Sequence, residues 1–204
     1  NPAGSDDTTF IELVNISSGL SATTLDIGGV TLSDGPSVPF SIPGGTQLAA
    51  GDHFLIVKNP TAFQVVYPNV STGQFTGPFL GNLSNAGESL KLDDAQGSTV
   101  VEFAYDDNHP WPNAADGSGA SLELIDPTGT PVDDFDNPER WRASTPIGGT
   151  PGTVSAVTLG VVINEVLTNS EAPNVDAIEL HNATAGSVDI TGWWLSDSDA
   201  KFDK

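Results

Sequence analysis

The residues in this sequence that are best suited to chemistry are carboxylates. Asp and Glu number 27 against 6 Lys and Arg, which gives a formal net charge of −21. The carboxylates are densest at Asp133, Asp134 and Asp136. Because Ca²⁺ takes roughly six to eight oxygen ligands from flexible loops, these three aspartates are the best candidates for a calcium site. No acidic run has the spacing of a calcium-binding loop, so a solvated acidic loop is the alternative.

The same charge argues against two kinds of partner. A strongly negative surface repels phosphate backbones and anionic lipid headgroups, so we expect no nucleic-acid binding. The sequence contains no apolar run of about 18 residues, and we therefore expect no membrane insertion. It also contains no Cys, which excludes disulfides and thiolate metal sites.

Signatures of catalysis are missing from the sequence. The histidines are His53, His109 and His181, and none belongs to a His-Glu-x-x-His motif. There is no Gly-x-Ser-x-Gly elbow and no phosphate-binding glycine loop before a helix. His181 also takes the place of Val14 in an internal repeat, which is a poor position for a catalytic base. We predict that the chain is not an enzyme.

The tryptophans raise the alternative of carbohydrate binding, since exposed aromatic rings stack on sugars. Trp111 lies between two prolines, an arrangement that could present its ring to solvent. The others, Trp141, Trp193 and Trp194, lie in or beside strand-like runs, where a large ring usually fills a core. Trp193 aligns with an apolar residue of the internal repeat and Trp194 does not. We therefore name Trp111 and Trp194 as the aromatic candidates for an interaction.

Short strands separated by turns account for most of the sequence. Alternation of apolar and polar residues, typical of half-buried strands, predicts them at residues 9–16, 25–32, 53–57, 89–93, 99–105 and 120–125. One helix is predicted at residues 59–67, because Asn59 is a good N-cap, Pro60 suits the first helical position and Pro68 ends the run. The expected fold class is all-β with one short helix.

An internal repeat divides the chain. The segment Phe10-Ile11-Glu12-Leu13-Val14-Asn15 reappears as Ala177-Ile178-Glu179-Leu180-His181-Asn182, at a domain-sized spacing. A stretch rich in Gly, Thr and Ser lies between the copies and has the composition of a linker. We assign residues 1–152 to a first domain, 153–158 to a linker and 159–204 to the opening strands of a second, truncated domain.

Further motifs follow one another in an order that points to a family. They are Val162-Ile163-Asn164-Glu165-Val166, Leu83-Ser84-Asn85-Ala86-Gly87-Glu88 and Trp141-Arg142-Ala143-Ser144. With the Ile-Glu-Leu-x-Asn stretches of the repeat, they resemble the lamin-tail domain as it occurs in secreted bacterial proteins. The resemblance implies an immunoglobulin-like antiparallel β-sandwich. It implies no reaction, and it places the chain outside the cell or at the cell surface.

The second copy opens with a strand at residues 161–167 that has no counterpart in the first copy. A sandwich in residues 1–152 that lacks its first strand would have an unpaired edge. We therefore expect Val161, Val162, Ile163 and Val166 to be interaction residues, completing the sandwich of a neighbouring chain or folding back on their own. Finding residues 161–167 unpaired, or paired only within residues 159–204, would contradict donation. The alternative is that residues 1–204 are a piece of a longer chain without exchange.

These observations lead to an expected function. We expect a non-catalytic extracellular module with a structural or adhesive role, self-assembling by strand exchange through residues 161–167. Its partners would be other protein chains, copies of itself among them. Two alternatives stay open, namely an accessory domain of a multidomain secreted enzyme, such as a nuclease or a polysaccharide-active protein, and a calcium-dependent binding module.

Overall fold

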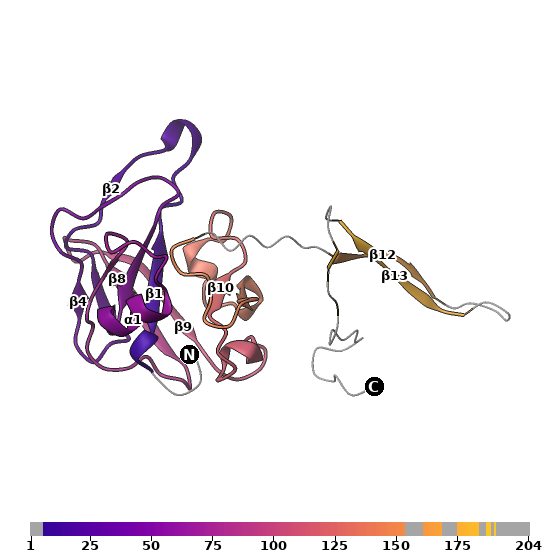
Figure 1. Cartoon of the computed structure of the whole chain (residues 1–204). Coiled ribbons are helices and arrows are strands. Elements are labelled where there is room, and N and C mark those ends of the chain that lie inside the picture. The colour runs from indigo at the N-terminus through magenta and orange to yellow at the C-terminus, as the bar shows by residue number, and fades with distance from the viewer. Residues whose placement is uncertain (1–5, 154–160, 169–174, 184–186, 189, 191–204) are drawn as a thin grey trace. The chain divides into compact units, whose positions relative to one another are not determined.

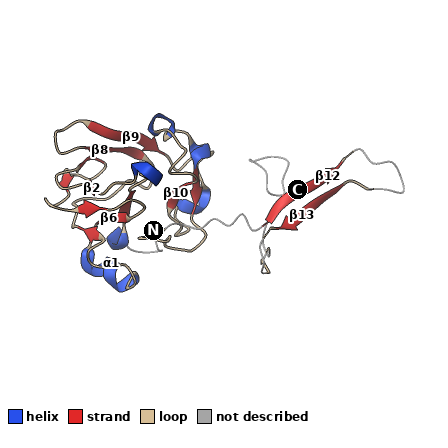
Figure 2. Cartoon of the chain, turned by 90° about the horizontal axis from the view of Figure 1, so that it is seen from above, coloured by secondary structure: helices blue, strands red, loops and turns tan. Residues whose placement is uncertain are grey.

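The computed structural model describes residues 6–153, 161–168, 175–183, 187–188 and 190 of the 204-residue chain. The chain divides into two compact units, Asn1–Ser155 and Ala156–Lys204, with the boundary inside the stretch predicted to be a linker. Strands make up 32% of the structure and helices 13%, so the predicted all-β fold class is confirmed (Figures 1 and 2). Among the described residues, no helix has the length and apolar character needed to cross a membrane.

Strand β6 (His53–Val57) is the centre of a three-stranded sheet in the first unit. It pairs antiparallel with β1 (Phe10–Val14) and parallel with β7 (Phe75–Thr76). Every residue from Phe54 to Val57 is buried, because both faces of the sheet are covered. The parallel pair corrects the expectation of a fully antiparallel fold. Its cause is the helical crossover between β6 and β7, which returns the chain in the same direction.

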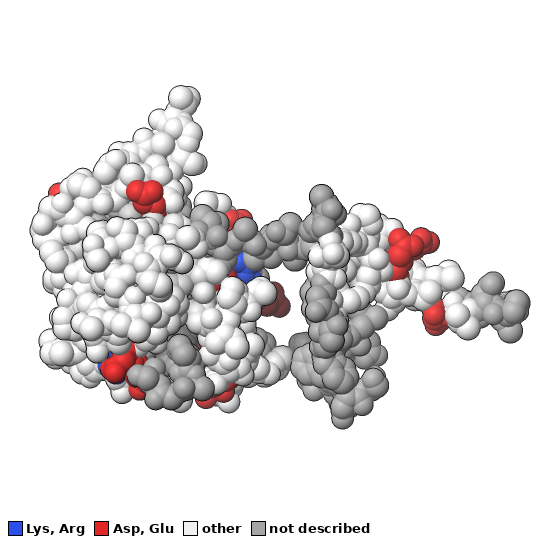
Figure 3. All heavy atoms as spheres, viewed as in Figure 1, with Lys and Arg blue, Asp and Glu red and all other residues white. Residues whose placement is uncertain are grey.

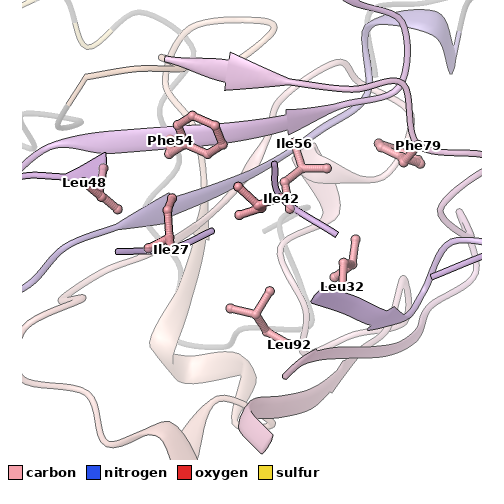
Figure 4. Close-up of a cluster of buried hydrophobic side chains, with 8 residues drawn as sticks. All are labelled: Ile27, Leu32, Ile42, Leu48, Phe54, Ile56, Phe79 and Leu92. Carbon is pink, nitrogen blue, oxygen red and sulfur yellow. The ribbon is translucent and has the colours of Figure 1, made fainter. Parts of the chain in front are cut away.

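A second sheet contributes to the same core as the first. It is antiparallel, with β4 (Phe40–Ser41), β3 (Thr31–Asp34), β8 (Glu88–Asp93) and β9 (Thr99–Tyr105) in that order. The pair β2 (Leu25–Asp26) and β5 (Gln47–Leu48) adds Leu48. Figure 4 shows the shared core cluster, which consists of Ile27, Leu32, Ile42, Leu48, Phe54, Ile56, Phe79 and Leu92. Whether the whole is immunoglobulin-like stays a prediction.

Helix α1 (Pro60–Val66) covers the opposite face of β6. As predicted, the Asn59 side chain caps it, accepting hydrogen bonds from the backbone N–H groups of Thr61 (3.1 Å) and Ala62 (3.2 Å). Phe63 is fully buried and forms a second cluster with Leu55, Val57 and Val70. Val66, on the last turn of the helix, is exposed.

Several strands differ from the sequence prediction. Residues 25–32 form two strands, β2 and β3, instead of one. Gly28 and Gly29 make the break, since Gly29 has a positive φ of 85° and a Cβ on Gly28 would lie 2.7 Å from the Gly45 backbone nitrogen. Short strands such as β5 and β7 were not predicted, because two residues cannot show an alternating pattern. The remaining pair of this unit joins β10 (Leu122–Leu124) to β11 (Trp141–Ala143).

The second unit is described as one antiparallel ribbon of two strands. Strand β12 (Val161–Leu167) pairs with β13 (Ala177–Asn182), with a bulge between Ile163 and Glu165. Both strands were expected from the sequence, and β13 starts at the residue that corresponds to the start of β1.

The two faces of β6 give a test of the fold. Phe63→Ala removes a fully buried ring that lies 5.9 Å from Phe10 and 5.2 Å from Phe75, and should lower the free energy of unfolding by about 3–5 kcal/mol. Val65→Ala on the same helix is the control, because Val65 is exposed; we expect a change of about 0.5 kcal/mol or less. Urea denaturation followed by circular dichroism measures both, and equal losses would contradict the described packing.

Candidate interaction surface

The three aspartates proposed as calcium ligands lie on the 3-10 turn Val132–Asp134 and just after it. Asp134 forms an ion pair with Arg140, and Asp136 Oδ1 accepts a hydrogen bond from the backbone N–H of Ala104 (2.6 Å). Asp133 is exposed. Nowhere in the described residues do three or more His, Asp or Glu side chains form a group that could hold a metal ion. The structure thus corrects the expected calcium site, because protein partners already use two of the carboxylates and separate them.

The carboxylate of Asp134 is held in its charged form. A hydrogen bond from the Arg140 guanidinium, with a second from the Asn137 amide (3.3 Å), lowers the pKa of Asp134 below its ordinary value. The acidic side chains seen in Figure 3 lie at separate places and do not form one patch. Asp134 therefore binds residues of its own turn, and Asp136 binds the backbone of β9.

Trp111 is buried, with 8% of its surface exposed, which corrects the expectation that its ring faces solvent. Its ring packs 6.2 Å from that of Trp141, and Trp141 stacks on Phe103 of β9 at 5.2 Å. The Trp141 indole N–H donates to the carbonyl of Phe135 (2.7 Å). Trp111 is thus part of an aromatic cluster. Its buried ring is not open for stacking on a sugar. Trp194 lies outside the described residues.

The predicted interaction residues of the second unit lie on β12. Ile163 is 56% exposed and Val166 is 51% exposed. Ile163 lies opposite Leu180 and Val166 opposite Ile178, so the four side chains share one side of the ribbon. Val162 is exposed too, and Val161 is half-buried. We call Ile163, Val166, Ile178 and Leu180 the ribbon face.

The internal repeat shows what the ribbon face corresponds to. Ile178 and Leu180 match Ile11 and Leu13 of β1, and in the first unit these two residues pack against the core cluster. The ribbon therefore exposes positions that the first unit covers. Exposed apolar surface of this kind is typical of binding sites, so the ribbon face is the candidate interaction surface among the described residues.

Strand β1 is the outer strand of its sheet. The backbone groups of its odd-numbered residues point to β6, as shown by Asn15 N–H donating to the carbonyl of Asp52 (3.1 Å). Phe10, Glu12 and Val14 must then direct their backbone groups to the opposite edge. No backbone partner meets them there within the described part of the chain. We call this the outer edge of β1.

The pairing of β12 with β13 lies wholly within residues 159–204. This is the pairing that contradicts donation of β12 to another sandwich, because the strand already has a partner next to it in the sequence.

The glutamate that both copies share has different partners in each. Glu179 Oε1 accepts a hydrogen bond from the Asn164 amide of β12 (2.5 Å). Glu12 Oε1 accepts one from the backbone N–H of Gly152 (2.7 Å) and lies 3.1 Å from His53 Nδ1. The shared asparagine is structural in the first copy, where the buried Asn15 amide donates to the carbonyl of Leu48 (2.9 Å).

Sequence reasoning had predicted an unpaired edge without naming its residues. The residues at that edge, Phe10, Glu12 and Val14, follow from the hydrogen bonds between β1 and β6, which the sequence does not show. The Asn164–Glu179 hydrogen bond was also missed.

The Asp134–Arg140 pair predicts a pH dependence. Because the folded pKa of Asp134 is lowered, the pair's contribution to stability is complete above the ordinary pKa of Asp and is lost as the pH falls through the lowered value. Arg140→Gln should raise the pKa of Asp134 towards its ordinary value in a carboxyl-carbon NMR titration. Arg142→Gln should leave it unchanged, since Arg142 pairs with Glu123 instead. A pKa of Asp134 that ignores Arg140→Gln would contradict the pairing.

Comparisons with known proteins complete the description of the site. No protein-family model, no curated protein sequence and no solved structure matches the chain.

Proposed function

We propose that the chain is a non-catalytic module of an extracellular or cell-surface protein, with a structural or adhesive role. Its partners are other protein chains, including copies of itself. The observation that carries this proposal is the ribbon face, on which large apolar side chains are about half exposed on two paired strands. Apolar surface of this kind marks sites where proteins associate.

Organisation in repeated domains supports a structural role. Equivalent strands, β1 and β13, occur in both units, and the motifs that resemble lamin-tail domains run through most of the sequence. Two sheets that share one core, as β6 and β8 do through Ile56 and Leu92, suit the immunoglobulin-like sandwich that this resemblance implies.

The charge supports a setting outside the cell and a protein partner. A net charge of −21 keeps a chain soluble and repels nucleic acid and anionic lipid. The two features that favoured other ligands have structural uses here, since Asp134 binds Arg140 and Trp111 packs on Trp141. The apolar ribbon face then remains as the described surface best suited to a partner.

Association of the whole chain tests the proposal. Light scattering over a concentration series should show a mass that rises above that of the monomer. The double variant Ile163→Thr, Val166→Thr should remain monomeric, because Thr keeps the β-propensity of the strand while removing apolar surface. The control is Val100→Thr with Ile125→Thr, which changes two apolar residues of the first unit whose exposure is similar, 50% and 52%.

The control variant should associate like the parent chain. A parent chain that stays monomeric at its highest soluble concentration would overturn the self-association that the proposal contains. Equal loss of association in both double variants would show that the ribbon face has no special part in it.

A further inference from the structure

We infer that Asn69 is the attachment site of an N-linked glycan. The inference rests on the proposed function, because this modification is made on proteins that leave the cell. It adds a modification site on the first unit, on a surface other than the ribbon face.

The acceptor motif for N-linked glycans, Asn-x-Ser/Thr, occurs four times in the sequence, at Asn15, Asn69, Asn82 and Asn182. Motifs of three residues recur by chance, so the fold has to decide which asparagine can carry a glycan. The first three tripeptides lie wholly within the described residues, whereas Thr184 of the fourth lies outside them.

Asn15 is excluded by its burial. Only 2% of the residue is exposed, and its side-chain amide donates to the backbone carbonyls of Thr23 (2.8 Å) and Leu48 (2.9 Å). A glycan replaces one of the two amide hydrogens, so one of these hydrogen bonds would be lost. A bulky sugar also has no space at a buried position. The folded first unit therefore excludes a glycan at Asn15.

Asn82 is exposed, but its tripeptide is tied to distant parts of the chain. The Asn82 Oδ1 atom accepts a hydrogen bond from the Lys58 ammonium. The backbone carbonyl of Ser84 accepts a hydrogen bond from the Tyr105 hydroxyl (2.7 Å), and the Ser84 N–H donates to the Glu88 carboxylate (2.6 Å). A transferase would have to break these contacts to bind the tripeptide, so Asn82 is a poor acceptor.

Asn69 lies in the turn between α1 and β7, and it meets the requirements of an acceptor. Asn69 and Ser71 are both exposed, and Val70 between them is buried in the second cluster with only 7% exposed. The burial of Val70 thus holds the turn with Asn69 and Ser71 at the surface. The Ser71 N–H donates to Gln74 Oε1 (3.1 Å), a bond within the same loop, so the tripeptide is not tied to distant parts of the chain.

The surface around Asn69 lacks the charges that keep the rest of the chain soluble. No charged residue occurs between Lys58 and Glu88, although the net charge of the chain is −21. Val65 and Val66, the last residues of α1, are 77% and 49% exposed. A glycan is bulky and strongly hydrated, and one attached shortly after Val66 would cover these apolar side chains. The position of the tripeptide therefore matches a surface that needs such a cover.

The attachment is a group transfer from an oligosaccharide carried on a polyprenyl diphosphate. The amide nitrogen of Asn69 attacks the anomeric carbon of the first sugar. A C–N bond forms while the C–O bond to the diphosphate breaks, and the polyprenyl diphosphate leaves. The amide nitrogen gives up one proton to a base of the transferase. No atom is oxidised or reduced.

Secretion of the full chain from mammalian cells, behind a cleavable signal, tests the site. Peptide-N-glycosidase removes an N-linked glycan and leaves Asp in place of the modified Asn, so peptide mass spectrometry identifies the position. We expect Asn69 to be converted to Asp in the secreted parent chain. Ser71→Ala destroys the tripeptide and should abolish this conversion. Thr72→Ala is the matched control, because it changes the next exposed hydroxyl without altering the tripeptide.

A second pair of variants covers the case in which Ser71→Ala fails to fold. Asn69→Gln should remove the glycosidase-sensitive mass from the intact secreted chain, and Asn82→Gln should leave that mass unchanged. Loss of the mass with Asn82→Gln alone would overturn the assignment to Asn69.

The outcomes separate this inference from the proposed function. Light scattering on chain made in the bacterial cytoplasm, without a glycan, tests association by itself. Association there, combined with an unmodified Asn69 in the secreted chain, overturns the inference and leaves the proposed function standing. A glycan on Asn69 without association supports the inference and overturns self-association. A glycan found on Asn15 of the folded, secreted chain would overturn the selection by burial.

Discussion

The burial of β6 on both faces is the constraint on which the rest of the first unit depends. Phe54 and Ile56 point into the core shared with the second sheet, and Leu55 and Val57 point to α1. A strand without an exposed face needs a cover on each side, and both covers are supplied by chain that follows it. The crossover through α1 provides one, and β8 provides part of the other. The parallel placement of β7 is a consequence of that crossover.

The position of β1 follows from the same arrangement. It is held to β6 along one edge, and its side chains alternate between the two clusters, with Ile11 and Leu13 on the core cluster and Phe10 against Phe63. Its other edge belongs to neither cluster. Within the described residues, an edge without a paired strand is thus fixed to the most deeply buried strand of the sheet.

The sequence was informative where a pattern is long or a residue has a local role. The α1 cap at Asn59, β8, β9 and the repeated strand at residues 177–182 all have such signals. Short strands such as β5 and β7 have two residues each, too few to show an alternation of apolar and polar side chains. They are strands because they pair with β2 and β6. Trp111 and Asp134 were misjudged for a related reason. Residue type indicated what each could bind, but the partners that use them, Trp141 and Arg140, were visible only in three dimensions.

The uninterrupted apolar run of β6 also has a consequence during folding. The pairs that build the core join distant parts of the sequence, Phe10 with Val57 and Thr31 with Asp93, and topologies of this kind close slowly. Until they close, Phe54-Leu55-Ile56-Val57 is an uncharged segment of the composition that aggregates. Asp52 and Lys58 bracket it with opposite charges, where gatekeeper residues are found. Charges in such flanking positions oppose pairing of apolar segments between chains, at a stage when no core is present to bury the strand between them.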